Sequence, residues 1–201
     1  MTMKKETMFA IGLLMVFVPH LVLADVTRKT VQNPDGTQER IFYSEGKEVA
    51  REFVDQDGVT TKIVGTIPDG LVKETFMDGA IREEAYYKNG KKDGVTKLYN
   101  KKGVLRGEFN FKNGKQEGLS KTYHTTGDLF KEIMFKNGKL EGVNREYTKD
   151  GKLLFEANFK DDKQNGITTR YHPDGGKTIA IYKKGQLVSE KHYDAEEKPN
   201  D

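Results

Sequence analysis

Hydrophobic and polar positions alternate with a period of two along most of the chain. In the clearest stretch, one parity holds mostly apolar and aromatic residues, apart from Lys97: Val95, Lys97 and Tyr99, then Leu105, Gly107, Phe109 and Phe111. Thr96 and Glu108 hold the opposite parity. A period of two is typical of β-strands with one apolar face. No turn-free stretch reaches the ~10–12 residues of a typical helix, so the pattern predicts strands throughout.

The predicted strands repeat, because one octet recurs every 24 residues. Its copies begin at Tyr87, Phe111, Phe135 and Phe159, and a shortened copy begins 23 residues later at Tyr182. The octet reads aromatic-Lys-Asn-Gly-Lys-x-x-Gly, with Asp161-Asp162 replacing Asn-Gly in the fourth copy. A second marker, a tyrosine followed four residues later by glycine, recurs at Tyr99, Tyr123, Tyr147 and Tyr171. Repetition at a fixed period indicates a repeat array.

Each repeat contains two turn signals. Asn89-Gly90, Asn113-Gly114 and Asn137-Gly138 favour the type I′ turn, which needs a positive φ at both central residues. The second signal ends in a glycine and favours a type I turn followed by a left-handed residue. The predicted fold is therefore all-β: an extended single-layer antiparallel β-meander of repeated hairpins.

The chain divides into four segments by sequence alone. Residues 63–193 carry the repeats, since Ile63 lies 24 residues before Tyr87. Residues 25–62 contain weaker copies, such as Tyr43–Gly46, and we interpret them as divergent N-terminal β repeats. Residues 194–201 are polar and are expected to form a disordered tail.

Residues 1–24 are typical of a secretory signal peptide. Lys4 and Lys5 precede an apolar run over residues 8–18, and Leu21–Ala24 precedes an expected cleavage site before Asp25. A run of 11 residues is short of the ~20 that span a bilayer, although an uncleaved N-terminal anchor is the alternative. We therefore expect export to the periplasm or the outside of a bacterium, as a soluble mature chain.

Composition and motifs argue against several functions. The net charge of +3 is too small for a typical duplex-DNA protein. The absence of cysteine excludes disulfides, Cys-ligated zinc and a thiol nucleophile. The glycines recur at turns, without a phosphate-binding loop. His124 and His172 lie two repeats apart, ~19 Å in a regular stack, so they cannot share a zinc ion. We expect no enzyme activity, no catalytic residues, no metal and no cofactor.

Two features are candidate binding surfaces. The first is an aromatic surface formed by two ladders on one face of the sheet: Tyr99, Tyr123, Tyr147 and Tyr171, and Phe111, Phe135 and Phe159. Its alternative role is an intramolecular core, covered by curling of the sheet or by the N-terminal segment. The second is a row of lysines beside the Asn-Gly turns, including Lys91, Lys115, Lys139 and Lys163. It suits a polyanion, although interleaved acids reduce its field and lysines also protect sheets from aggregation.

The two-turn units resemble the bacterial variant of the MORN repeat. The resemblance rests on Tyr/Phe-Lys-Asn-Gly-Lys-x-x-Gly followed by x-x-x-Tyr-x-x-x-Gly. It implies protein–protein contact, dimerisation or binding to lipid headgroups, and some bacterial members of the variant family are labelled antitoxin-like. It supplies no catalytic residues. Asp161-Asp162 and Gly175-Gly176 depart from the pattern, and we expect them to mark an end cap.

Three functional hypotheses follow from these features. The first is an exported, non-enzymatic scaffold that binds an unknown protein partner, or a second copy of itself, in the cell envelope. The second is binding of an anionic lipid or polysaccharide surface through the lysine edge. The third is an antitoxin or immunity protein that neutralises an exported toxin. Nucleic acid is not expected as a partner.

Overall fold

The computed structural model describes residues 25–195, and all regular elements in that range are strands. Seventeen strands form one open sheet in which almost all neighbouring pairs are antiparallel. The predicted all-β, single-layer hairpin array is therefore confirmed. The predicted signal peptide and most of the predicted tail lie outside the described residues.

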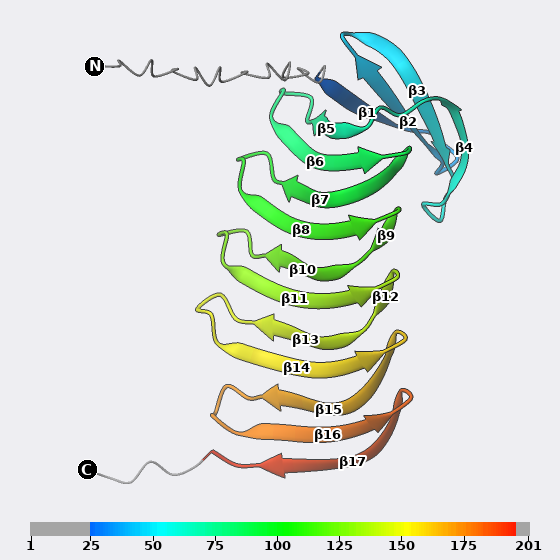
Figure 1. Ribbon diagram of the computed structural model, residues 1–201. Helices are drawn as coiled ribbons and strands as arrows, with labels where there is room; N and C mark the ends of the chain where they lie inside the picture. Colours follow the sequence, from blue (N-terminus) through cyan, green and yellow to red (C-terminus); the bar gives the residue numbers. More distant parts are fainter. Residues whose placement is uncertain (1–24, 196–201) are drawn as a thin grey trace, which may run out of the picture.

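The repeats form a stack of curved hairpins that follows the order of the sequence (Figure 1). From β5 to β17, each long strand of the stack pairs with the next one along the chain. The short strands β9 and β12 are the first parts of the strands that continue as β10 and β13. The strands are β5 (Gly70–Thr75), β6 (Ile81–Lys88), β7 (Lys91–Tyr99), β8 (Leu105–Lys112), β9 (Lys115–Gln116), β10 (Gly118–Tyr123), β11 (Leu129–Lys136), β12 (Lys139–Leu140), β13 (Gly142–Tyr147), β14 (Leu153–Lys160), β15 (Lys163–Tyr171), β16 (Lys177–Lys183) and β17 (Gln186–Tyr193).

Residues 26–65 form an antiparallel meander of their own beside the first repeat, here called the N-terminal meander (Figure 1). Its strands are β1 (Val26–Gln32), β2 (Gln38–Ser44), β3 (Lys47–Val54) and β4 (Thr60–Gly65). The meander joins the array through a parallel pairing of β1 with β5. Ile63 lies in β4 and pairs with Glu52 of β3, so the regular array begins at Gly70. Sequence spacing alone did not reveal that Ile63 belongs to the N-terminal meander and not to the array.

Both predicted turns are present. Lys88 pairs with Lys91 across Asn89 and Gly90, whose φ angles are 51° and 72°. Both values are positive, as a type I′ turn requires. At the other end of the hairpins, the Gly103 N–H donates to the Asn100 carbonyl at 2.9 Å, and Gly103 has a φ of 75°. This geometry fits a type I turn followed by a left-handed glycine.

The departures of the fourth unit, expected to mark an end cap, do not interrupt the stack. Asp161 and Asp162 adopt φ angles of 48° and 66°, so they form the same turn as Asn-Gly. Aspartate tolerates the left-handed region because its short polar side chain can hydrogen-bond locally. The array then continues through β15, β16 and β17. A change of turn residues is therefore compatible with continued stacking.

The last glycine of each octet lies at a β-bulge. Ala85 pairs with Thr96, but two residues further on Tyr87 pairs with Lys92, so extra residues around Gly94 face a single residue of β6. Gly94 has a φ of 116°, and the equivalent Gly118, Gly142 and Gly166 also have positive φ angles. Bulges bend a strand and increase its twist, which accounts for the curved strands in Figure 1.

The hydrophobic core lies where the N-terminal meander meets the first repeat. Its buried residues come from both parts of the molecule: Val26, Phe42, Ala50, Ile67, Val72, Ala85 and Tyr87. Further along the array, the fully buried positions are small, as at Ser120 and Ala157. Small side chains become buried in a single-layer sheet when larger neighbours on the same face close over them.

Candidate binding surfaces of the array

The two aromatic ladders lie on opposite faces of the sheet. Directly paired residues of neighbouring strands point to the same face. Thr96 pairs with Phe109, whereas Lys97 pairs with Glu108. The prediction of one continuous apolar face was therefore wrong. It assumed that odd-numbered residues on both strands share a face, but the pairing register joins even-numbered residues of β7 to odd-numbered residues of β8.

One face, here called the Tyr face, combines tyrosines with charged residues. The Tyr99 hydroxyl donates to Glu84 at 2.9 Å, and the Tyr147 hydroxyl donates to Glu132 at the same distance. Arg145 donates to Glu156 at 2.6 Å across the neighbouring strands. The Tyr face consists of Tyr99, Tyr123, Tyr147, Glu84, Glu108, Glu132, Glu156, Lys97, Lys121 and Arg145. Its polar groups are largely paired with one another.

The Tyr-face hydroxyls resist ionisation. Burial, the hydrogen bond to Glu84 and the charges of Glu84 and Glu108 raise the pKa of Tyr99 to about 12. Burial and the Glu132 contact also raise the pKa of Tyr147. Tyr171, the fourth predicted member of the ladder, is 39% exposed and lies at the end of β15. Tyr99 and Tyr147 thus join neighbouring strands through their hydroxyls, a contact that Tyr171 does not make within residues 25–195.

The other face, here called the Phe face, is the apolar side of the array. Phe111 pairs with Gly94, Phe135 with Gly118 and Phe159 with Gly142, so each ring lies opposite a bulge glycine. The Phe face consists of Phe109, Phe111, Ile133, Phe135, Leu140, Phe155 and Phe159, together with the small residues between them. All seven of these side chains are only half-buried.

The first rung of the Phe ladder is covered by the N-terminal meander. Tyr87 occupies the position of Phe111 one repeat earlier, since it pairs with Gly70 as Phe111 pairs with Gly94. The ring of Phe42 stands edge-on against Tyr87, with ring centroids 5.7 Å apart. Tyr87 is buried, in contrast to the half-buried phenylalanines. The expected covering by the N-terminal segment therefore applies to one rung.

A buried ionic network joins the two parts at the same place. Arg28 on β1 contacts Glu74 of β5 and lies 3.1 Å from Glu83 of β6, and it donates to the Tyr87 hydroxyl at 3.2 Å. Lys92 lies 2.7 Å from Glu83. Burial favours the neutral form of Glu83, but Arg28 and Lys92 outweigh it and lower the pKa. Burial lowers the pKa of Lys92 despite Glu83. This network had no sequence signal, because Arg28 lies outside the clear repeats.

The lysines of the turn edge are exposed, and the acids between them have a structural role. The Glu117 carboxylate accepts the backbone N–H of Asn137 at 2.6 Å, so a side chain of one repeat holds the turn of the next. The same contact recurs in each unit: Asp69 with Asn89, Asp93 with Asn113, Glu141 with Asp161, and Asn165 with Lys184. We call these acceptors the turn staples. They explain the acid one residue before the octet glycine.

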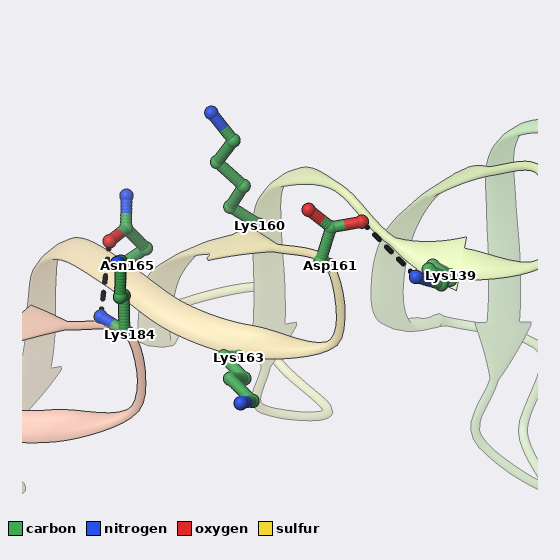
Figure 2. A pocket seen from close by; sticks show the side chains of 6 residues that line it. All are labelled: Lys139, Lys160, Asp161, Lys163, Asn165 and Lys184. Atoms are coloured by element: carbon green, nitrogen blue, oxygen red, sulfur yellow. Dashed lines mark hydrogen bonds and ion pairs between the residues drawn. The ribbon is translucent and has the colours of Figure 1, made fainter.

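The lysines cluster most strongly at the C-terminal end of the edge. A shallow hollow of about 590 Å³ is lined by Lys160, Lys163, Lys184, Asn165, Lys139 and Asp161 (Figure 2). Asp161 forms an ion pair with Lys139 at 3.3 Å. It forms no ion pair with the ammonium groups of Lys160, Lys163 or Lys184. Asn165 replaces the acid that serves as staple in earlier units. The acidic staple is therefore missing beside Lys163, whereas Lys91 and Lys115 lie beside acidic staples; Asp161 and Asp162 supply the carboxylates of this turn.

The histidines have local partners. His124 and His172 both begin a second turn, because their carbonyls accept the N–H of Gly127 and Gly175. His172 and His192 contact the hydroxyl of Thr178 at 2.7 and 2.8 Å. Within residues 25–195, no three histidine, aspartate or glutamate side chains are gathered as a metal site would need. The same range contains no helix that is sufficiently long and apolar to cross a membrane.

An open, single-layer array of β-hairpins is the class of protein that this geometry defines. Three consecutive stretches match the family model of the MORN repeat variant: residues 92–113, 116–137 and 140–161. Each begins on a strand that follows the type I′ turn and ends at the next such turn. The resemblance to the MORN repeat variant is thus confirmed for three repeats.

Other comparisons add little. No curated protein matches the chain. A chain in the crystal structure of the GtfA/B complex bound to UDP and GlcNAc is 12% identical, with a TM-score of 0.20 over 89% of this chain and 25% of that one. A chain from accessory secretory protein 1, 2 and 3 of Streptococcus pneumoniae is 11% identical, with a TM-score of 0.17 over 77% and 19%. Likenesses this weak say nothing about function, and this chain spans only about a quarter and a fifth of those two chains.

Proposed function

We propose that this protein is an exported, non-enzymatic scaffold that binds a protein partner through the Phe face. The observation that carries the proposal is the contrast between the covered Tyr87 and the half-buried Phe111, Phe135 and Phe159. A continuous face of half-buried aromatic rings suits an interaction surface, because the remaining water contact with aromatic rings is unfavourable. MORN repeats generally mediate binding to proteins or membranes, which supports the same proposal.

A crosslinking experiment tests which face binds. A photo-crosslinking amino acid at Phe135 samples the Phe face, and the same group at Lys121 samples the Tyr face of a neighbouring strand. We expect a discrete crosslinked protein from position 135 in the native compartment, and none from position 121. Capture by position 121 alone would contradict the proposal. With the crosslinked partner purified, Phe135→Ser should weaken its binding by at least about ten-fold, as expected for a central aromatic contact.

Export is tested separately. The support for it is the three-part pattern of residues 1–24, with its positive start and short apolar run. We expect the mature protein, purified from fractionated cells, to begin at Asp25 and to be found with envelope or secreted proteins. A cytosolic protein that begins at Met1 would contradict this part of the proposal.

Binding to an anionic surface is a second candidate, favoured by the cluster of Lys160, Lys163 and Lys184 where a neutral staple replaces an acid. Sedimentation with anionic vesicles at low salt, and its loss at high salt, would support this candidate. Lys160→Gln combined with Lys163→Gln should reduce sedimentation more than the matched pair Lys112→Gln with Lys115→Gln, which lies beside the acidic staple Glu117. No sedimentation at low salt would contradict it.

An immunity protein is a special case of the proposed scaffold, with an exported toxin as the partner. The antitoxin-like label of some related bacterial proteins supports it. It predicts that a toxin encoded beside this gene is the protein crosslinked at position 135. A partner without toxicity would exclude this special case and leave the scaffold proposal in place.

A further inference from the structure

The chain contains its own example of how the Phe face is occupied. At the first rung, the N-terminal meander contributes one aromatic ring, Phe42, and one charged group, Arg28, which are directly paired neighbours on β2 and β1. Phe42 packs against Tyr87, while Arg28 pairs with Glu74 and Glu83. The occupant of this face is thus a strand pair that presents a ring beside a charge opposite to that of the array.

The later rungs have room for such a ring. A hollow of about 190 Å³ lies along β11 to β14. Its apolar lining is Ile133, Leu140, Phe155 and Phe159 of the Phe face, and its polar lining is Lys131, Asn144, Arg145 and Glu146. An enclosed apolar cavity of ~150 Å³ accepts benzene in another protein, so this open hollow is large enough for one aromatic ring. The surface is continuous with the covered first rung, because all these residues belong to the same face of one sheet.

The charge around the later rungs is mixed, because Glu146 keeps the acid three units after Glu74 while two other equivalent positions hold cations. The repeat register places Arg170 four units after Glu74 and Lys131 two units after Glu83. Lys131 is paired with Glu146 at 3.0 Å. Arg170 is exposed and lies over the Phe155 ring at 5.4 Å, and no carboxylate among residues 25–195 forms an ion pair with it. Lys131 neutralises Glu146 at the edge of the hollow, and Arg170, over the Phe155 ring that lines the hollow, is left as an available cation.

We propose that the Phe face between β10 and β15 binds a segment of a protein partner that presents an aromatic side chain and a carboxylate on one face of an extended strand. The ring enters the hollow beside Ile133 and Phe159, and the carboxylate pairs with Arg170. This inference rests on the proposed scaffold function and specifies the chemistry of its partner.

Three small probes test the chemistry without knowledge of the partner. The probes are 3-phenylpropionate, 3-phenylpropanol and 3-phenylpropylamine, which share a ring and differ in charge. Binding to the full mature chain is measured from the NMR chemical shifts of the Ile133 and Leu140 methyl groups. We expect 3-phenylpropionate to bind about two- to five-fold more tightly than the alcohol at low salt, as an exposed ion pair allows. The amine should bind most weakly.

Matched variants locate the site. Ile133→Trp should fill the hollow and abolish the shifts, whereas Met134→Trp, on the same strand but the Tyr face, should leave binding unchanged. Arg170→Gln should retain ring binding and remove the preference for the carboxylate. Absence of methyl shifts with all probes, or equal affinity for the acid and the amine, would overturn the inference. A partner crosslinked at position 135 in that case would leave the scaffold function intact, whereas probe binding without any partner would contradict the scaffold function alone.

Discussion

Phe42 and Tyr87 are separated by 45 positions in the sequence, yet their rings meet edge to face with planes inclined at 78°. The contact closes the N-terminal meander over the first rung of the Phe ladder. Phe42 is 0% exposed and belongs to the main hydrophobic core of the molecule. On the Phe face of the array beyond it, the phenylalanines are only half-buried and the buried residues are small. The N-terminal meander therefore stabilises one end of the array.

Phe42→Ala should destabilise this junction by about 3–5 kcal/mol, because it removes a large fully buried ring and leaves a cavity. Chemical denaturation should show the loss. Hydrogen exchange should show β1–β4 opening at lower free energy than β10–β14. Tyr193→Ala, at an exposed position of β17, serves as the control and should change stability by less than about 0.5 kcal/mol. A Phe42→Ala chain with unchanged stability would show that this contact is dispensable.

Glu83 should make the junction sensitive to acid. Burial favours its neutral form, but Arg28 and Lys92 dominate and lower the pKa. A carboxylate with a lowered pKa in the folded state adds stability above its unfolded pKa of ~4.3, and this stability is lost as pH falls through the folded value. We expect the free energy of unfolding to decline below about pH 5, and Glu83→Gln to flatten that decline.

The control for the acid experiment is Glu190→Gln, because Glu190 is exposed on β17. It should leave the acid limb of the stability curve unchanged. Glu83→Gln should also weaken the fold at neutral pH, since Arg28 and Lys92 lose a shared partner inside the protein. An acid limb that is equally steep in both variants would mean that other carboxylates determine the pH dependence.

The sequence predicts the hairpins well because the responsible signals are local. A type I′ turn needs two positive φ angles, and the dipeptide Asn89-Gly90 predicts them from local sequence alone. The period of two predicts strands for the same reason. The faces were mispredicted because the side on which a residue lies after a turn depends on the number of residues in that turn. The register between β7 and β8 depends on how many residues the turn and bulge absorb, as the pairing of Thr96 with Phe109 shows.

The candidate surfaces depend on contacts that local patterns do not contain. The position of Arg28 between Glu74 and Glu83 follows from the parallel pairing of β1 with β5, a long-range event without a turn signal. The turn staples had a visible signal, since an acid precedes the octet glycine in three successive repeats. Each of these acids lies 20 residues before the first central residue of the next type I′ turn. This fixed spacing is the sequence signal from which a contact between repeats could be inferred.

Removal of one turn staple should loosen the turn of the next repeat. Glu117→Ala leaves the Asn137 N–H without its 2.6 Å acceptor, and we expect a loss of about 1 kcal/mol. The Asn137 amide should exchange about five-fold faster with solvent, which is that free energy expressed as a rate ratio. Glu117→Gln retains an oxygen acceptor and should lie closer to the original protein. Equal effects of both substitutions would show that charge, rather than the hydrogen bond, holds the turn.

The bulge glycines should differ in their tolerance of a side chain. Gly94 has a φ of 116°, and an added Cβ would lie 3.1 Å from the Cβ of Tyr86. Gly118 holds the same place one repeat later, with a φ of 84° and no neighbouring atom within 4 Å of an added Cβ. Gly118→Ala should cost about 1 kcal/mol from backbone strain alone. Gly94→Ala should cost about 1–2 kcal/mol more, because it adds crowding.

Thermal and chemical denaturation of the two alanine variants would measure that difference directly. If Gly94→Ala and Gly118→Ala were equally stable, crowding at Tyr86 would be relieved by a small shift of that side chain. A larger loss at Gly118 would contradict the geometry of the bulge, since nothing lies near its missing side chain.

Tyr99 should ionise later than an ordinary tyrosine. Burial, the hydrogen bond donated to Glu84 and the charges of Glu84 and Glu108 raise its pKa to about 12 from the usual ~10. A phenol with a raised pKa in the folded state adds stability that is complete below pH ~10 and is lost as pH rises through the folded value. An ultraviolet titration of the phenolates should therefore contain a late phase that Tyr99→Phe removes, while circular dichroism checks that the sheet is intact. Glu84→Gln should move that phase to lower pH, because it removes the carboxylate that raises the pKa of Tyr99 more than Glu108 does. A titration that is identical with and without Tyr99 would contradict the contact on which the Tyr face depends.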